Sequence, residues 1–191
     1  MKIYHSQMNL LRIYPSKTAL TTFFLSLGIF FLGLGILHLV QRYNPRRLSF
    51  NMEISSGKNS KQSYPVKITI KRLDIDLPVI PSSIKKGVWE TTTKGVSWLS
   101  NSPSPGSPGN SILYGHNWTN LLGPLTRIKA GDEIAVKMNN GKEVRLFVTV
   151  TATVSPSDIS ILYPSQKPQV TIYTCAGFLD TRRFVATAQI L

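Results

Sequence analysis

The sequence predicts an all-β domain, an eight-stranded antiparallel barrel with short helices, preceded by one N-terminal transmembrane helix. A long uncharged apolar run near the N-terminus predicts the helix. Short apolar runs separated by turn signals predict the strands, and neither a long amphipathic helical pattern nor an internal repeat is found. The 128 residues from 64 to 191 are enough for a closed or nearly closed barrel.

The apolar run extends from Thr18 to Val40, and no Asp, Glu, Lys or Arg lies between Lys17 and Arg42. About 20 such residues cross a bilayer as a helix. A buried core helix is usually shorter and apolar on one side only. A cleavable signal peptide has a core of about 7–15 residues and a small-x-small site, which "LHLVQRYN" lacks. We therefore expect an uncleaved anchor over residues 18–40, after a short segment, 1–17.

Residues 41–63 are polar and basic, and we expect them to form a linker. The chain has 22 Lys and Arg against 9 Asp and Glu, with a net excess of +7 within residues 1–63 alone. Basic residues beside a membrane span attract anionic lipid head groups, which are an expected partner. The rest of the chain has no aromatic-interleaved RNA motif and no zinc-finger spacing, so nucleic-acid binding is not expected.

The expected strands follow in order along the domain 64–191. The first two are alternating or short apolar runs, and Pro78 in the second indicates an edge or a bulge. The loop 100–110 is rich in Pro, Gly and Ser, and a short helical turn broken at Gly123-Pro124 precedes a hairpin over "NNGK". The expected strand segments are "YPVKITIKRL", "IDLPVI", "SILYGHN", "EIAVKM", "KEVRLFVTVTATV", "QVTIYTC" and "RRFVATAQIL".

Cys175, the only cysteine, ends one of these strands, and "AG" after it indicates a loop. Strand alternation places Thr171, Tyr173 and Cys175 on one face. A single cysteine forms no internal disulfide, and it is either a buried structural side chain or a nucleophile at a strand end.

A nucleophilic thiolate needs a base or a positive partner. Of three histidines, only His116 lies in the domain, at the end of "SILYG", which leaves one possible Cys–His pair. One Cys and one His are too few for a usual zinc site, so no metal is expected. Arg182 and Arg183 open the last strand after a short loop, and one of them could stabilise a thiolate or an oxyanion. Asp180 could pair with either arginine.

The segments "YGHN", "TIYTC" and "RRFVAT" resemble, in this order, the histidine, TLxTC and arginine elements of the sortase family. "GPLTRIKAGDEI" and "VSPSDISILYPSQKPQVTIYTC" are similar to the family's segments after the histidine and before the cysteine. The resemblance covers about Val66 to Leu191. In the TLxTC element, Ile172 stands where the family usually has Leu. Papain-like and cell-wall peptidases differ, because their Cys precedes their His.

The resemblance implies an eight-stranded β-barrel transpeptidase on the outer face of a bacterial membrane, with residues 1–17 cytoplasmic and 64–191 extracellular. Cys175 would attack a carbonyl in an LPxTG-like sorting signal of a surface protein. The thioacyl-enzyme would pass to an amine of a cell-wall precursor or a pilin lysine. His116 would transfer protons, and Arg183 would bind the oxyanion, with Arg182 in reserve. Arg182, Thr174 and Asn117 are the candidates for substrate binding.

Two departures from the family lead to further expectations. The loop before the cysteine strand has only one acid, Asp158, so no calcium site and no cofactor are expected. The Asp-Pro-aromatic motif of pilus-type lids is absent between Pro45 and Tyr64, so an open site is expected. The sequence leaves open the sortase class, a hydrolase with the same thioacyl-enzyme, and an anchored binding or scaffold module with a structural cysteine.

Overall fold

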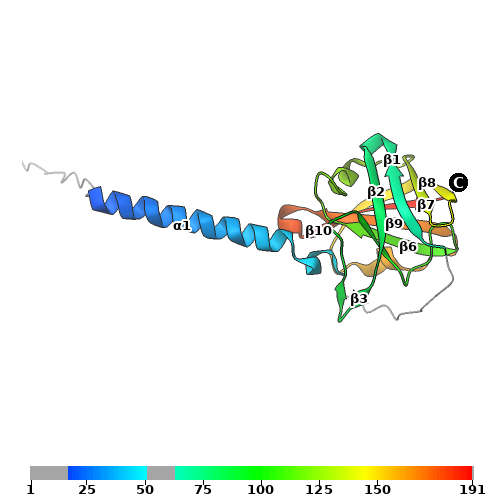
Figure 1. Ribbon diagram of the computed structural model, residues 1–191, viewed down its shortest axis with the longest axis horizontal. Coiled ribbons are helices and arrows are strands. Elements are labelled where there is room, and N and C mark those ends of the chain that lie inside the picture. Colours follow the sequence, from blue (N-terminus) through cyan, green and yellow to red (C-terminus); the bar gives the residue numbers. More distant parts are fainter. Residues whose placement is uncertain (1–16, 51–62, 191) are drawn as a thin grey trace, which may run out of the picture. The chain divides into compact units, whose positions relative to one another are not determined.

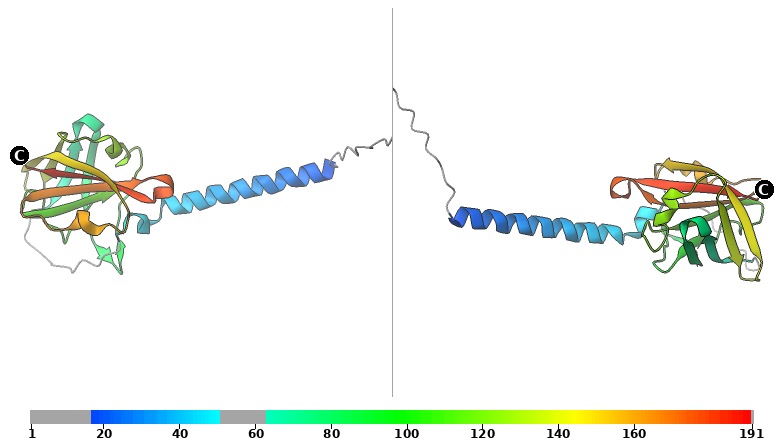
Figure 2. Two further views of the ribbon diagram at one scale, coloured as in Figure 1. Left: turned by 180° about the vertical axis from the view of Figure 1, so that it is seen from behind. Right: turned by 90° about the horizontal axis from the view of Figure 1, so that it is seen from above.

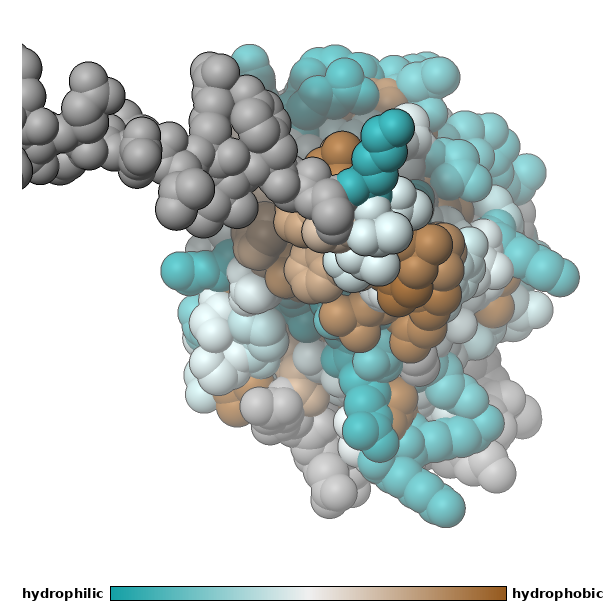
Figure 3. Space-filling model, turned by 90° about the vertical axis from the view of Figure 1, so that its left-hand side faces the viewer, coloured by the Kyte–Doolittle hydropathy of each residue, from teal (hydrophilic) through white to brown (hydrophobic). Residues whose placement is uncertain are grey.

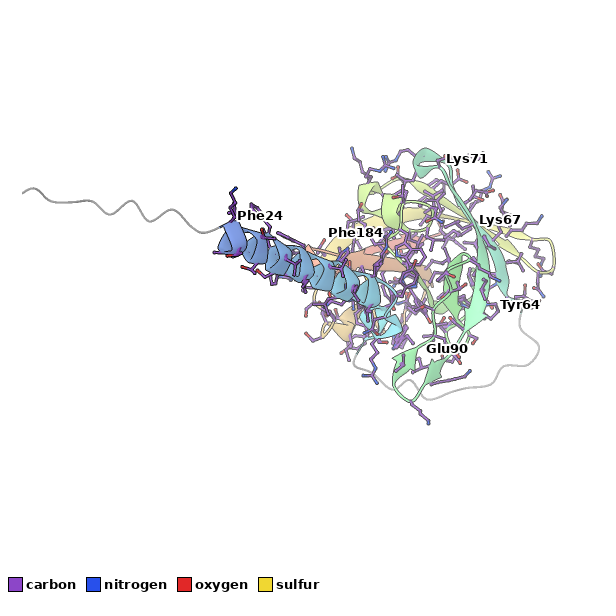
Figure 4. The ribbon with its side chains drawn as sticks, turned by 60° about the vertical axis from the view of Figure 1, so that its left-hand side comes forward. Phe24, Tyr64, Lys67, Lys71, Glu90 and Phe184 are labelled. Atoms are coloured by element: carbon purple, nitrogen blue, oxygen red, sulfur yellow. The ribbon has the colours of Figure 1, made fainter. Side chains whose placement is uncertain are left out.

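The computed structural model describes residues 17–50 and 63–190, and the chain divides into two compact units, residues 1–44 and 45–191. The described part of the first unit is dominated by helix α1, Lys17–Arg42. At 1.5 Å per residue its 26 residues extend about 39 Å, enough to cross a bilayer core of about 30 Å. No residue of α1 is buried, unlike a core helix, and Phe24 projects from it (Figure 4). Hydrophobic residues, in brown, lie in the foreground of Figure 3. By length and composition, α1 is thus a candidate membrane span.

The second unit is a closed barrel (Figure 1). Its described strands are hydrogen-bonded in the order β1-β2-β5-β6-β9-β10-β8-β7. A separate two-stranded hairpin, β3–β4, lies outside the barrel. The strands are β1 Pro65–Ile70, β2 Ile75–Ser82, β3 Ile84–Lys85, β4 Val88–Trp89, β5 Val96–Leu99, β6 Gly109–Gly115, β7 Glu133–Met138, β8 Glu143–Val154, β9 Pro168–Ala176 and β10 Arg182–Gln189. The 3₁₀ turns are η1 Pro45–Leu48, η2 Lys71–Leu73, η3 Gly123–Arg127, η4 Ile159–Leu162 and η5 Phe178–Asp180.

The eight-stranded barrel is confirmed, but the expectation that it is antiparallel throughout is wrong. β2 pairs with β5, and β6 with β9, in parallel. A parallel neighbour needs a long crossover, and residues 83–95 supply one between β2 and β5. Pro78 is not on an edge, because β2 has a neighbour on each side. It lies just before Val79, where the pairing with β5 begins.

The hairpin over "NNGK" is confirmed. β7 and β8 pair from Glu133 opposite Phe147 to Lys137 opposite Glu143. Gly141 in the turn has a φ of 82°, a conformation that glycine adopts without strain. The helical turn expected to break at Gly123-Pro124 instead begins there, because proline is tolerated in the first turn of a helix.

Alternation along β9 divides the packing into two clusters. Val170 and Ile172 point into the barrel core, whereas Tyr173 and Cys175 belong to a second apolar cluster on the outer face. Figure 2 shows β9 in orange and β10 in red side by side, with β8 in yellow on the far side of β10. The strands β6, β9 and β10 form the wall on which the candidate site is built.

Candidate active site

Cys175 and Arg183 lie directly opposite each other in the antiparallel pairing of β9 and β10. Side chains in such a pair leave the sheet on the same face. Both are almost fully buried, with 4% of Cys175 and 3% of Arg183 exposed. Arg182, opposite Ala176, is exposed. Of the two arginines, the structure thus places Arg183 beside the thiol.

His116 reaches the same end of the wall from β6. In the parallel pairing of β6 with β9, Gly115 lies opposite Thr174, so the residue after each is His116 and Cys175. The Thr174 hydroxyl donates a hydrogen bond to the Gly115 carbonyl at 2.8 Å. Thr174 therefore fixes the strand end that carries His116. Because side chains alternate along β9, the Thr174 side chain points away from the face that carries Cys175.

The His116 ring is held by its neighbours. It stacks on Trp118, with ring centroids 4.7 Å apart and an angle of 16° between the planes. Its Nε2 lies 3.4 Å from the Thr91 hydroxyl. Burial lowers the pKa of His116, and the nearby Asp180 carboxylate opposes that shift. The imidazole is therefore neutral at pH 7, the form that can accept a proton.

The thiol is also in its neutral form. Burial raises the pKa of Cys175 to about 11; Arg183 acts to lower this pKa, Asp180 raises it further and Arg47 lowers it. The covered site thus holds an unreactive thiol, since the thiolate is the nucleophile.

Within the described part of the chain, one N–H donor of the Arg183 guanidinium is left without a hydrogen-bond partner. Its guanidinium donates to the carbonyls of Asp180 and Arg182 at 3.0 and 2.9 Å. Among the described residues, its buried Nε finds no hydrogen-bond partner. A buried N–H without a partner is costly, and here it lies on the residue opposite the Cys175 thiol.

The loop between β9 and β10 orients Asp180. Gly177, Leu179 and Asp180 all have positive φ, a strained conformation for the last two. The sequence left open whether Asp180 pairs with Arg182 or Arg183. Its carboxylate instead forms an ion pair with Arg47, with 2.6 Å between Nη1 and Oδ2.

Arg47 belongs to the segment Pro45–Phe50, which we call the strap, and the strap covers the thiol. Cys175 Sγ donates to the Arg47 carbonyl at 3.4 Å, and the Tyr173 hydroxyl donates to the Leu48 carbonyl at 2.9 Å. Leu48 and Phe50 are fully buried in the outer cluster. The expectation of an open site is therefore wrong: the lid motif is absent, but two apolar side chains in a polar stretch close the site without it.

The strap packs on an aromatic floor. The Phe50 ring meets Tyr173 edge-on at 5.0 Å and Trp89 at 5.9 Å. Burial of Leu48 and of Phe50 stabilises the strap by about 1.5–3 kcal/mol each. Each hydrogen bond of the strap contributes about 1 kcal/mol. Fixing six residues costs about 1–2 kcal/mol per residue. Gain and cost are therefore of similar size.

The other predicted residues are placed as follows. Asn117 is exposed next to His116, and Thr174 acts within the strand wall. Sequence reasoning missed Arg47, Trp89 and Thr91, which come from segments far from the motifs. The pair of isolated apolar residues in "PRRLSF" is the one trace that the strap leaves in the sequence.

Within residues 17–50 and 63–190, no group of three or more His, Cys, Asp or Glu is placed to hold a metal ion. The absence of a calcium site stays a prediction.

Comparisons with known proteins identify the family of this chain. The sequence model of the sortase domain matches residues 68–191. Sortase A of Bacillus anthracis is 25% identical over 143 residues, which are 73% of this chain and 65% of that protein. The chain thus spans slightly less than two thirds of this relative.

Two solved structures share the fold. Sortase C-1 of Actinomyces oris is 26% identical with a TM-score of 0.58, covering 66% of this chain and 74% of that one. Listeria monocytogenes sortase A is 24% identical with a TM-score of 0.54, covering 66% and 87%. Because the sortase domain matches well over half of the residues, on a barrel that carries Cys175, His116 and Arg183 at one end of its wall, the chain belongs to the sortase family.

Proposed function

We propose that this sortase is a membrane-anchored cysteine transpeptidase that cleaves an LPxTG-like C-terminal sorting signal and transfers it to an amine. The observation that carries the proposal is the register of three neighbouring strands. It brings Cys175, His116 and Arg183 to the same end of β9, β6 and β10. Nucleophile, base and oxyanion donor are the groups that acyl transfer requires.

In the proposed reaction, His116 takes the thiol proton and the Cys175 sulfur attacks the scissile carbonyl carbon. A C–S bond forms, and the Arg183 guanidinium, through its unpartnered Nε, stabilises the oxyanion. The C–N bond breaks as His116 returns the proton to the leaving amine. An incoming amine then attacks the thioester and gives a proton to His116, which passes it to the departing thiolate.

The proposed location is the outer face of a bacterial membrane, with α1 as a single-pass anchor and residues 1–17 in the cytoplasm. The length and apolar surface of α1 support it. The basic residues that flank α1 would meet anionic lipid head groups. The donors would be surface proteins, and the acceptor a cell-wall precursor or a pilin lysine.

The test uses the full chain in detergent with a panel of LPxTG-like peptides and an amine. Intact mass should show a thioacyl adduct on wild type and none on Cys175→Ala, and product mass should show transfer to the amine. Mass spectra without added amine separate transfer from hydrolysis. If wild type and Cys175→Ala give the same products across the panel, the proposal fails.

A further inference from the structure

The loop between β9 and β10 exposes apolar side chains that the proposed reaction does not use. Phe178 is 83% exposed, the highest value for any large apolar side chain in residues 17–50 and 63–190. Along α1 the most exposed apolar side chain, Leu32, reaches only 67%. Leu179, which follows Phe178, is 46% exposed. Single exposed apolar residues are ordinary on a protein surface, but an adjacent pair of this exposure marks a candidate interaction site.

The backbone of the loop fixes this pair in place. Leu179 has a φ of 51°, a left-handed conformation that costs free energy in leucine and that glycine or asparagine adopts more readily. The Asp180 N–H donates to the Gly177 carbonyl at 3.2 Å. The Thr181 hydroxyl donates to the Phe178 carbonyl at 2.9 Å. The loop is therefore a hydrogen-bonded turn that keeps a leucine where a polar residue would be less strained.

Basic residues accompany the apolar pair. Arg182 is exposed, and its stem lies against the loop, since a Cβ built on Gly177 would be 3.1 Å from Arg182 Cγ. The one carboxylate of the loop, on Asp180, is paired with Arg47 at 2.6 Å. Arg46, the residue before Arg47, is also exposed. An apolar tip accompanied by cationic side chains is typical of segments that enter the head-group region of an anionic bilayer.

The chain limits how far this loop can be from a bilayer that α1 crosses. Arg42 ends α1 and Pro45 begins the strap, so three Cα–Cα steps, at most about 11 Å, separate the two residues. The strap in turn is bonded to the loop through the ion pair of Arg47 and Asp180. Head groups extend about 5–7 Å beyond each side of the hydrocarbon core. A loop tethered over so short a stretch of chain can reach the head groups of the leaflet in which α1 ends.

From these observations we infer that the loop tip, Phe178 and Leu179, inserts into the outer leaflet of the membrane that carries the anchor, with Arg182 at the lipid phosphates. The partner is an anionic phospholipid surface. The inference rests on the proposed location, because it needs α1 to span a bilayer, but it does not need the proposed reaction. Since the loop joins the paired ends of β9 and β10, insertion holds Cys175 and Arg183 at the membrane surface.

The test uses the full chain with one fluorescent NBD label at a time, and Cys175→Ala removes the native thiol. The labelled positions are Phe178→Cys at the tip, Leu32→Cys within α1 and Tyr163→Cys as the control. Tyr163 is an exposed aromatic residue whose carbonyl accepts from Asn110 at the other end of β6. The chain is reconstituted in vesicles of phosphatidylcholine and phosphatidylglycerol. Lipid with a doxyl group on its acyl chain should quench the labels at positions 178 and 32 and leave the label at 163 unchanged.

A variant of the tip separates loss of insertion from loss of the fold. On the chain labelled at position 178, Leu179→Asn removes one inserted side chain and should lower the ratio of inserted to free loop about 10- to 100-fold. Asparagine adopts the positive φ more readily than leucine. Thermal unfolding of Leu179→Asn in detergent should therefore begin no earlier than that of the parent.

A second variant tests the charge. Arg182→Gln should lower the ratio of inserted to free loop about 5-fold in vesicles that contain phosphatidylglycerol. In vesicles of phosphatidylcholine alone, Arg182→Gln and its parent should give the same ratio. Lys167→Gln removes an exposed charge from the loop before β9 and is the matched control, expected to behave like the parent in both kinds of vesicle.

The inference is overturned if the labels at positions 178 and 163 are quenched equally. Quenching at position 32 would then leave the anchor standing, whereas no quenching at 32 would refute the proposed location. A blue shift at position 178 that grows with protein density and occurs without quenching would assign the tip to a second copy of the chain, and it also overturns the inference. Failure of the proposed reaction is seen separately, as the absence of a thioacyl adduct on the wild-type chain.

Discussion

Arg183 lies directly opposite Cys175 across β9 and β10, and its buried Nε has no hydrogen-bond partner among the described residues. A guanidinium opposite a thiol, with one donor unused, can stabilise negative charge that develops on a neighbouring oxygen during a reaction. The same pairing leaves Arg182 exposed on the other side of the strand.

Replacing Arg183 by Lys should lower the rate of thioacyl-enzyme formation by about 10²–10³-fold, because one oxyanion donor with fixed geometry is lost. The measurement is single-turnover adduct formation by intact mass, with thermal unfolding to check the fold. Arg182→Lys is the matched change and should have little effect. Loss of activity in Arg182→Lys but not in Arg183→Lys would show that Arg182, and not Arg183, binds the oxyanion.

Thr174→Val should lower the free energy of unfolding by about 1 kcal/mol, because the Gly115 carbonyl loses the Thr174 hydroxyl and stays buried. Urea unfolding followed by tryptophan fluorescence measures this change. Thr174→Ser keeps the hydroxyl, so it should preserve the Gly115 hydrogen bond that Val removes. Loss of stability in the Ser variant with none in the Val variant would show that the methyl group, rather than the hydrogen bond, stabilises the site.

Alkylation of wild-type Cys175 should rise about tenfold per pH unit and show no plateau below about pH 10, since the thiol has a pKa of about 11. At pH 8 only about a thousandth of it is thiolate. The same chain in denaturant should reach its plateau about two units lower, near the ordinary pKa of cysteine. A folded-state plateau near pH 8.5 would contradict the desolvated site.

His116 should make the domain less stable as the pH falls. Its folded pKa is lowered, so between its folded and unfolded pKa values the unfolded chain binds a proton that the native state does not. The stabilising contribution is therefore complete above the unfolded pKa and is lost as pH falls through the folded pKa. His116→Gln should reduce the slope of unfolding free energy between pH 7 and 5. The two proteins should have equal slopes between pH 8 and 9; a steeper slope in the variant at low pH would refute the assignment.

The sequence supported predictions that depend on local pattern. Strand alternation correctly divided Tyr173 and Cys175 from Val170 and Ile172, and Asn-Gly correctly placed the β7–β8 hairpin. The single Cys and the single domain His gave a candidate pair whose catalytic roles stay a prediction. The predictions of alternation and of the hairpin are confirmed because side-chain periodicity and turn geometry depend on neighbours in the chain.

Other features depend on which segments meet across the fold. Parallel pairing of β6 with β9 sets His116 level with Cys175, and no local pattern encodes which strand becomes a neighbour. The Asp180 carboxylate pairs with Arg47, 133 positions away in the chain, rather than with the arginines beside it.

The sequence by itself determined an all-β domain after an apolar helix, with Cys175 at a strand end, because composition and period are properties of the chain alone. Only the tertiary structure decided that Arg183 faces the thiol and that the strap lies over it. Leu48 and Phe50 look like two stray apolar residues in a polar linker, and they acquire their role only where the outer face of β9 offers them a surface on which to be buried.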